Sequence, residues 1–173
     1  YIHIDEYQDT NKVQYEIVRF LAHGHNNIFC VGDLDQNIYS WRGSTTENIL
    51  AFESTYPELT TILLEENYRS TQNIIAVSNH IIEKNVRRKK KRLFTNNPEG
   101  EKLSLIFGFD EHDEATKTVL AIDELLGSGV PAEEIAVLYR ANFQSRVLEE
   151  ACLTHNVPYR VLGTRFFDRK EVK

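Results

Sequence analysis

Two adjacent carboxylates, Asp5 and Glu6, stand at the end of a short apolar segment that is typical of a β-strand. One carboxylate in such a place can hold Mg²⁺ through its water shell, and its neighbour can orient or deprotonate an attacking water molecule. An acidic helix N-terminus, which the helix dipole favours in any case, would account for the same two residues. The pair alone therefore leaves both nucleotide hydrolysis and a purely structural role open.

A second candidate site is the polar stretch 32–43, which contains Tyr39, the single tryptophan Trp41, and Arg42. Aromatic side chains among turn-forming residues can stack on unpaired bases, and each stack contributes about 1–3 kcal/mol. An arginine there can bind a phosphate or a neighbouring carboxylate. The same aromatic residues would equally suit a long loop that is fixed to the core.

Two further segments carry cations. Tyr68 and Arg69 stand where a strand-like segment meets a helix, so the arginine can reach a γ-phosphate and the tyrosine can stack on a purine. Pairing of Arg69 with Glu65 or Glu66 is the structural alternative. The six consecutive cations at 87–92 fit a solvated surface, a phosphate-binding patch or a localisation signal.

The elements that must position these residues alternate between strand-like and helix-like patterns. We therefore expect an α/β fold with a parallel sheet, in which ligands bind at the carboxyl ends of the strands, where the polar clusters stand. Thr10 is the expected N-cap of the first helix. Strands are predicted over 1–5, 27–33, 60–65, 103–107, 135–139 and 159–162, and helices over 11–23, 45–56, 71–86, 111–126 and 143–155.

The composition is that of a globular protein, with 41% hydrophobic and 27% charged residues in a chain of 173. Residues 1–86 hold 5 Lys or Arg against 12 Asp or Glu, so a divalent cation is expected to mediate any binding of polyphosphate there. No apolar run approaches the roughly 20 residues that cross a bilayer, and no secretory signal is recognisable, so we expect a cytoplasmic protein without membrane contact. The chain contains no methionine and starts within a strand-like pattern, so we expect it to be a piece of a longer protein.

In their order along the chain, the candidate sites resemble motifs II, III and IV of the UvrD/Rep/PcrA-type superfamily 1 DNA helicases. The matching segments are Asp-Glu-Tyr-Gln-Asp-Thr at 5–10, Gly-Asp-x-Asp-Gln-x-Ile-Tyr-x-Trp-Arg-Gly at 32–43 and Glu-Asn-Tyr-Arg-Ser at 66–70. Segments 137–146 and 166–171 are also similar to that family, so the resemblance spans essentially the whole chain.

The resemblance implies an α/β, RecA-like fold of the P-loop NTPase type, with ATP bound between two motor domains. Residues 1–66 would be the C-terminal half of the first domain, and residues 67–173 the N-terminal half of the second. The implied function is that of an ATP-dependent DNA helicase or translocase, which moves along single-stranded DNA and unwinds duplexes with 3′→5′ polarity in DNA repair or replication. ATP and Mg²⁺ are the implied cofactors, and single-stranded DNA and duplex junctions are the implied partners.

The resemblance also implies roles for individual residues. Asp5 and Glu6 would bind Mg²⁺, and Glu6 would also be the catalytic base. Gln36 would sense the γ-phosphate, Arg69 would act as an arginine finger, and Tyr68 would stack on the adenine ring. The implied contacts to single-stranded DNA are Tyr39, Trp41, Arg42, Arg140, Asn142 and Arg165.

The family pattern is altered and incomplete in this chain. Asn37 stands where a Ser is usual and Ser44 where an Ala is common, and we expect neither change to affect the chemistry. The chain lacks the Gly-x-x-x-x-Gly-Lys-Ser/Thr phosphate loop, the upstream adenine-binding glutamine segment and the last two motifs. Since the loop's amides and lysine cradle the phosphates, we expect the chain alone to hydrolyse ATP at a negligible rate.

Three other functions fit parts of the pattern. The chain could be an isolated module that binds single-stranded DNA, or part of a helicase–nuclease subunit with the same motifs. A metal nuclease could use the carboxylates of Asp5, Glu6, Asp9 and Asp33. That last function would leave the aromatic loop and the Tyr68–Arg69 pair without a role.

The stacking hypothesis for Trp41 predicts that Trp41→Ala weakens binding of a single-stranded oligonucleotide by about 1–3 kcal/mol, because one base loses its stacking partner. The measurement is fluorescence anisotropy of a labelled oligonucleotide titrated with each protein. Unchanged affinity would show that Trp41 instead fixes the loop to the core.

Overall fold

A computed structural model describes residues 1–39, 43–44, 47–85 and 90–162. The predicted DNA contacts Trp41, Arg42 and Arg165 lie outside these described residues. The chain divides into two compact units, 1–103 and 104–173. The boundary that the sequence predicts between two partial motor domains, at 66/67, stays a prediction.

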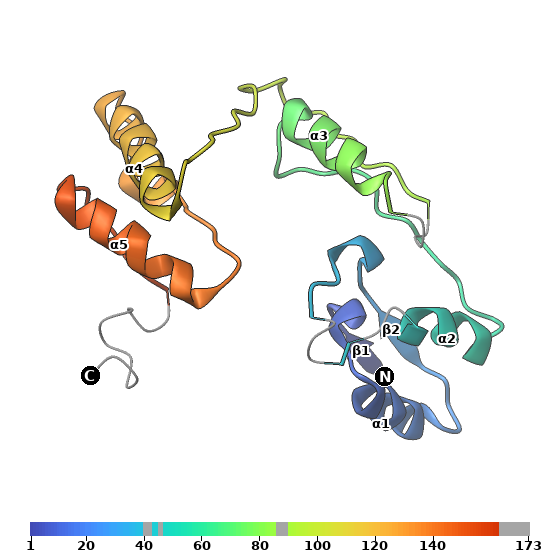
Figure 1. Cartoon of the computed structure of the whole chain (residues 1–173). Coiled ribbons are helices and arrows are strands. Elements are labelled where there is room, and N and C mark those ends of the chain that lie inside the picture. Colours follow the sequence, from blue (N-terminus) through green and yellow to red (C-terminus); the bar gives the residue numbers. More distant parts are fainter. Residues whose placement is uncertain (40–42, 45–46, 86–89, 163–173) are drawn as a thin grey trace, which may run out of the picture. The chain divides into compact units, whose positions relative to one another are not determined.

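The first unit is built around a parallel β–α–β arrangement. Strand β1 (Ile2–Ile4) leads through helix α1 (Lys12–Ala22) to strand β2 (Ile28–Cys30). The two strands pair in parallel, with Ile2 opposite Ile28 (Figure 1). Because parallel strands need a crossover between them, the helix follows from the strand order. The strands predicted over 1–5 and 27–33, and the helix predicted over 11–23, are thereby confirmed.

Helix α1 begins with a reciprocal capping box at Asn11. The Asn11 Oδ1 accepts a hydrogen bond from the Gln14 N–H at 3.0 Å, and the Gln14 Oε1 accepts one from the Asn11 N–H at 2.9 Å. The prediction of Thr10 as N-cap was wrong. The Thr10 hydroxyl instead donates to the Tyr7 carbonyl at 2.7 Å, which closes the preceding 3-10 turn η1 (Tyr7–Asp9).

The other predicted helices are present with slightly shorter or shifted ends. The amphipathic patterns of the sequence account for them, since each has an apolar face to bury. They are α2 (Glu47–Thr55) and α3 (Gln72–Ile82) in the first unit, and α4 (Glu111–Gly127) and α5 (Ser145–Thr154) in the second. The structure also has the short 3-10 turns η2 (Leu34–Gln36), η4 (Ala132–Glu134) and η5 (Asn142–Gln144), of which the sequence did not predict η2 and η4.

Four predicted strands, over 60–65, 103–107, 135–139 and 159–162, are not formed in the structure. Their apolar side chains are largely exposed: Leu64 is 78% exposed, Leu105 78% and Leu138 93%. An apolar run becomes a strand only when a neighbouring backbone satisfies its N–H and C=O groups. Among the described residues, the named strands β1 and β2 pair only with each other.

Each unit has its own small core. In the first, the buried rings of Tyr7 and Phe52 meet edge to face, with centroids 5.3 Å apart, which packs helix α2 against turn η1. In the second, Val119 of α4, Cys152 of α5 and Val157 form the buried cluster between the two helices. Within the described ranges, no helix combines the length and apolarity needed to cross a membrane.

Replacing Asn11 by Ala is expected to destabilise the first unit by about 1 kcal/mol, because helix α1 loses the side-chain acceptor for its first turn. The free energy of unfolding of the chain is measured by urea titration with circular dichroism detection. Lys12→Ala, at the exposed neighbouring position, is the control. Equal stability of the two variants would contradict a capping role for Asn11.

Candidate functional site

The carboxylates of Asp5 and Glu6 are exposed just beyond the carboxyl end of strand β1. The Asp5 Oδ1 accepts a hydrogen bond from the Glu6 N–H at 2.9 Å. Glu6 has a left-handed backbone, with φ 49° and ψ 45°. A residue with a β-carbon adopts this conformation at a cost of about 1–3 kcal/mol, and such strain concentrates at functional sites. The strain therefore marks Glu6 independently of its charge.

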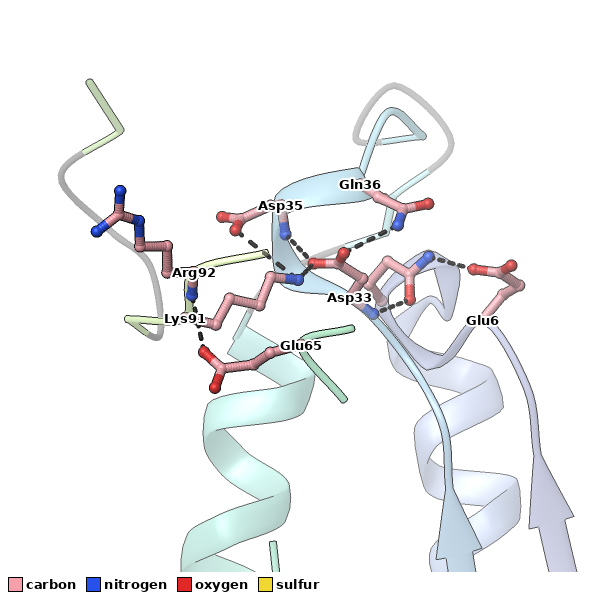
Figure 2. Close-up of polar contacts among 8 residues, drawn as sticks. Glu6, Asp33, Asp35, Gln36, Glu65, Lys91 and Arg92 are labelled. Carbon is pink, nitrogen blue, oxygen red and sulfur yellow. Dashed lines mark hydrogen bonds and ion pairs between the residues drawn. The ribbon is translucent and has the colours of Figure 1, made fainter. Parts of the chain in front are cut away.

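The side chain of Gln8 connects the ends of the two strands. Gln8 is only 1% exposed, and its Nε2 donates to the Glu6 Oε2 at 2.6 Å. Its Oε1 accepts a hydrogen bond from the Asp33 N–H at 2.9 Å, beyond the end of β2 (Figure 2). Its carbonyl oxygen accepts one from the Asn37 side chain at 2.7 Å. The sequence predicted no role for Gln8; the available signal was an uncharged polar residue two positions after Glu6 inside the acidic motif.

Gly32 allows this close approach of the two strand ends. A β-carbon on Gly32 would lie 2.8 Å from the Gln8 Oε1 and 3.2 Å from the Tyr7 backbone nitrogen. Both distances are shorter than ordinary van der Waals contact. The Tyr7 N–H also donates to the Val31 carbonyl at 2.9 Å, so turn η1 is fixed directly against the end of β2.

Asp33 hydrogen-bonds both to Gln8, through its backbone N–H, and to Gln36, through its carboxylate. The Asp33 Oδ2 accepts a hydrogen bond from the Gln36 Nε2 at 2.8 Å, while Oδ1 accepts one from the Asp35 N–H at 2.9 Å and pairs with the ammonium of Lys91. Burial alone would raise the pKa of the Asp33 carboxyl, but hydrogen bonds from Lys91 and Gln36 outweigh it, so the pKa lies below its ordinary value. The structure thus brings the predicted residues Glu6 and Gln36 into one hydrogen-bonded chain, through Gln8 and Asp33.

Tyr68 and Arg69 lie in the loop that precedes helix α3. The Tyr68 ring is 78% exposed, and its hydroxyl donates to the Glu66 Oε2 at 2.8 Å. That hydrogen bond and the charge of Glu66 raise the pKa of Tyr68. The other Glu66 oxygen accepts a hydrogen bond from the Asn96 amide at 2.7 Å. The Arg69 N–H donates to the Asn67 Oδ1 at 3.0 Å, which fixes the backbone from which the exposed arginine extends.

The two departures from the family pattern contact each other. The Ser44 hydroxyl donates to the Asn37 Oδ1 at 3.2 Å, and Asn37 donates in turn to the Gln8 carbonyl. The half-buried Tyr39 lies between them in sequence, and its carbonyl accepts a hydrogen bond from the Ser44 N–H at 3.4 Å. The ends of the predicted DNA-binding loop are therefore tied together and to Gln8.

The remaining described DNA-contact candidates, Arg140 and Asn142, belong to the second unit. Both are exposed, and Asn142 is the first residue of η5. Arg140 lines an open pocket together with residues of α4 and α5, including Ala115 and Val147. The predicted residues are therefore distributed over both units.

The residues at the end of β1 suit a magnesium ion that is shared with a nucleotide. Within the part of the chain that the structure describes, no three His, Cys, Asp or Glu side chains gather as a metal-binding group. Magnesium in ATPases usually takes only one or two carboxylates and completes its shell with water and phosphate oxygens. Asp5 and Glu6, as exposed neighbouring carboxylates, fit that requirement.

Comparison with known proteins matches both parts of the chain to one group of helicases. The model of the UvrD/REP helicase N-terminal domain matches residues 1–57, and that of the UvrD-like helicase C-terminal domain matches residues 62–173. The whole chain is 51% identical to the ATP-dependent DNA helicase PcrA of Staphylococcus epidermidis and 49% identical to that of Staphylococcus aureus (strain Mu50). It spans 24% of the length of each of these relatives.

The lowered pKa of Asp33 gives a test of the contacts at this site. Because the folded-state pKa is below the unfolded value of about 3.9, the native state binds fewer protons, and the contribution to stability is present above that pH. It is lost as the pH falls through the folded pKa. The free energy of unfolding of the wild type should therefore fall toward that of Asp33→Asn below about pH 4. A constant difference between the two proteins from pH 7 to pH 3 would contradict the ion pair.

Proposed function

This chain belongs to the UvrD-like helicase family, and on that premise we propose that it carries part of the ATPase site of a DNA helicase. The observation that carries the proposal is the hydrogen-bonded chain from Glu6 through Gln8 and Asp33 to Gln36. It joins the Glu6 carboxylate, which can accept a proton, to the Gln36 amide, which can hydrogen-bond to the γ-phosphate of ATP. A surface cluster of acids would need neither the buried glutamine nor the strained backbone.

Glu6 is the proposed catalytic base. Gln8 holds its Oε2 by a hydrogen bond of 2.6 Å, which fixes the carboxylate and leaves Oε1 to accept a proton from the attacking water. Asp5, with Glu6 beside it, would hold Mg²⁺, which neutralises charge on the phosphate oxygens of ATP when bound. Gln36, held by Asp33, is the proposed sensor of the γ-phosphate.

Tyr68 and Arg69 are the proposed contacts to the rest of the nucleotide. The Tyr68 hydroxyl is anchored to Glu66 while the ring is exposed, so a face of the ring is available to stack on adenine. Arg69 extends from a backbone fixed by Asn67 and supplies positive charge to the phosphate that is transferred.

The proposed whole protein moves along single-stranded DNA. Its RecA-like motor domains would include residues 1–66 and 67–173, and the stacking and phosphate contacts would come from Tyr39, Trp41, Arg42, Arg140, Asn142 and Arg165. Gln36 is three residues before Tyr39 in the chain. A movement of Gln36 on loss of the γ-phosphate would therefore reach the proposed DNA contact Tyr39 through three residues of backbone. We propose 3′→5′ movement, action at duplex junctions, and a role in DNA repair or replication.

Glu6→Gln in the full-length protein is expected to lower the rate of DNA-stimulated ATP hydrolysis by about 10²–10⁴-fold, because the amide cannot accept the proton. Nucleotide affinity should change little, since the side-chain shape is kept. The measurements are phosphate release with single-stranded DNA present and binding of a fluorescent ATP analogue.

Glu58→Gln, which removes an exposed carboxylate after helix α2, is the matched control and should hydrolyse ATP at the wild-type rate. Wild-type turnover by the Glu6→Gln protein would exclude Glu6 as the base. Strand displacement from duplexes with either a 3′ or a 5′ tail tests the polarity in the same preparation.

A further inference from the structure

Lys91, which belongs to the basic run 87–92, contacts the carboxylates of Asp33 and Asp35 beside the proposed nucleotide site. The Lys91 ammonium pairs with the Asp33 carboxylate and lies 3.9 Å from the Asp35 Oδ2 (Figure 2). The three side chains are only 17%, 20% and 10% exposed, respectively. An ion pair on an open surface contributes little, but partial removal from water strengthens the attraction between the charges.

Asp33 is the acceptor that Lys91 and Gln36 share. Its Oδ1 pairs with Lys91 and its Oδ2 accepts the hydrogen bond from the Gln36 amide at 2.8 Å. Rotation of the Asp33 carboxylate would break its contact with Lys91 or with Gln36. The lysine therefore holds the carboxylate in place, and the carboxylate orients the Gln36 amide. The position of Lys91 therefore affects Gln36 through a single intervening side chain.

The backbone next to Lys91 is attached to the segment that leads into Tyr68. The Arg92 N–H donates to the Glu65 Oε1 at 2.8 Å, and the Phe94 N–H donates to the Glu65 carbonyl at 2.9 Å. The Asn67 N–H donates to the Phe94 carbonyl at 2.7 Å. Residues 92–94 therefore run beside 65–67, so Lys91 moves with the backbone that carries Tyr68 and Arg69.

We propose that Lys91 is a positioning residue that connects the Tyr68–Arg69 segment to the Gln36 amide through Asp33. The inference rests on the proposed function and deepens it. The contact connects residues from both helicase-domain matches, because Asp33 and Gln36 lie within 1–57 while Lys91 lies within 62–173. A shift of the Tyr68–Arg69 segment withdraws the ammonium from Asp33, and Gln36 then loses the fixed carboxylate that orients it.

The surroundings of Lys91 favour this role over contact with DNA. Its ammonium faces Asp33 and Asp35, and a phosphate brought to the same place would meet two carboxylates. Lys90, the preceding cation of the run, is exposed and offers a matched comparison. The two lysines have the same chemistry in adjacent positions and differ in what surrounds them.

The test compares Lys91→Ala, Lys91→Arg and Lys90→Ala in the full-length protein. Because misplacing a catalytic group by a small distance slows the chemical step, Lys91→Ala should lower kcat for ATP at saturating DNA by about ten- to hundredfold. The KM for ATP and the affinity for DNA should stay within about twofold. Lys91→Arg should restore kcat to within about threefold, and Lys90→Ala should match the wild type.

A double variant tests whether Lys91 acts through Asp33, and a thermal transition checks that each variant is folded. If Lys91 acts through Asp33, adding Lys91→Ala to Asp33→Ala should lower kcat no further. Lys91→Gln, which keeps most of the side-chain length, replaces Lys91→Ala if that variant lacks a cooperative thermal transition.

Two results would overturn the inference: equal kcat for Lys91→Ala and Lys90→Ala, or a loss confined to DNA affinity with a shallower salt dependence. Failure of the wild-type full-length protein to show DNA-stimulated hydrolysis would instead reject the proposed function.

Discussion

The buried amide of Gln8 is the interaction on which the geometry of the site depends. An unpaired amide in this position would cost about 1–3 kcal/mol, so both ends must find partners. Its oxygen takes the Asp33 N–H and its nitrogen takes the Glu6 carboxylate, and this requirement sets the spacing between the ends of β1 and β2. Gly32 leaves room for the amide. The segments 5–10, with Asp5 and Glu6, and 32–43, with Gln36, are therefore parts of one hydrogen-bonded unit.

The sequence predicts the first β–α–β arrangement well because its patterns are local. Apolar residues of strand and helix period alternate over 1–33, and each element has its partner within that range. The strands predicted over 60–65, 103–107, 135–139 and 159–162 fail for the complementary reason. Apolar periodicity reports the tendency to be buried, whereas a strand also needs a second backbone, and no local signal specifies which one.

The same distinction applies to the candidate site. Residue types identify Asp5, Glu6, Tyr68 and Arg69 as groups able to do chemistry, and the family resemblance adds Gln36. Contacts over long sequence separations identify Gln8 and Lys91, which lie 25 and 58 positions from Asp33, and periodicity carries no information about such pairs. The family pattern singles out Asn37 and Ser44 as departures, but only the structure shows that they hydrogen-bond to each other.

Glu6 combines two opposing contributions to stability, its left-handed backbone and its contact to Gln8. Glycine or asparagine adopts φ 49° at lower cost, but glycine would also leave the buried Gln8 nitrogen without its carboxylate acceptor, which costs a comparable amount, about 1–3 kcal/mol. With a glutamate in this position, the backbone strain is offset by the hydrogen bond to Gln8, and the carboxylate leaves the strand end at a fixed angle. A protein engineer who selected only for heat resistance would therefore gain little by replacing this residue, and would lose the proposed base.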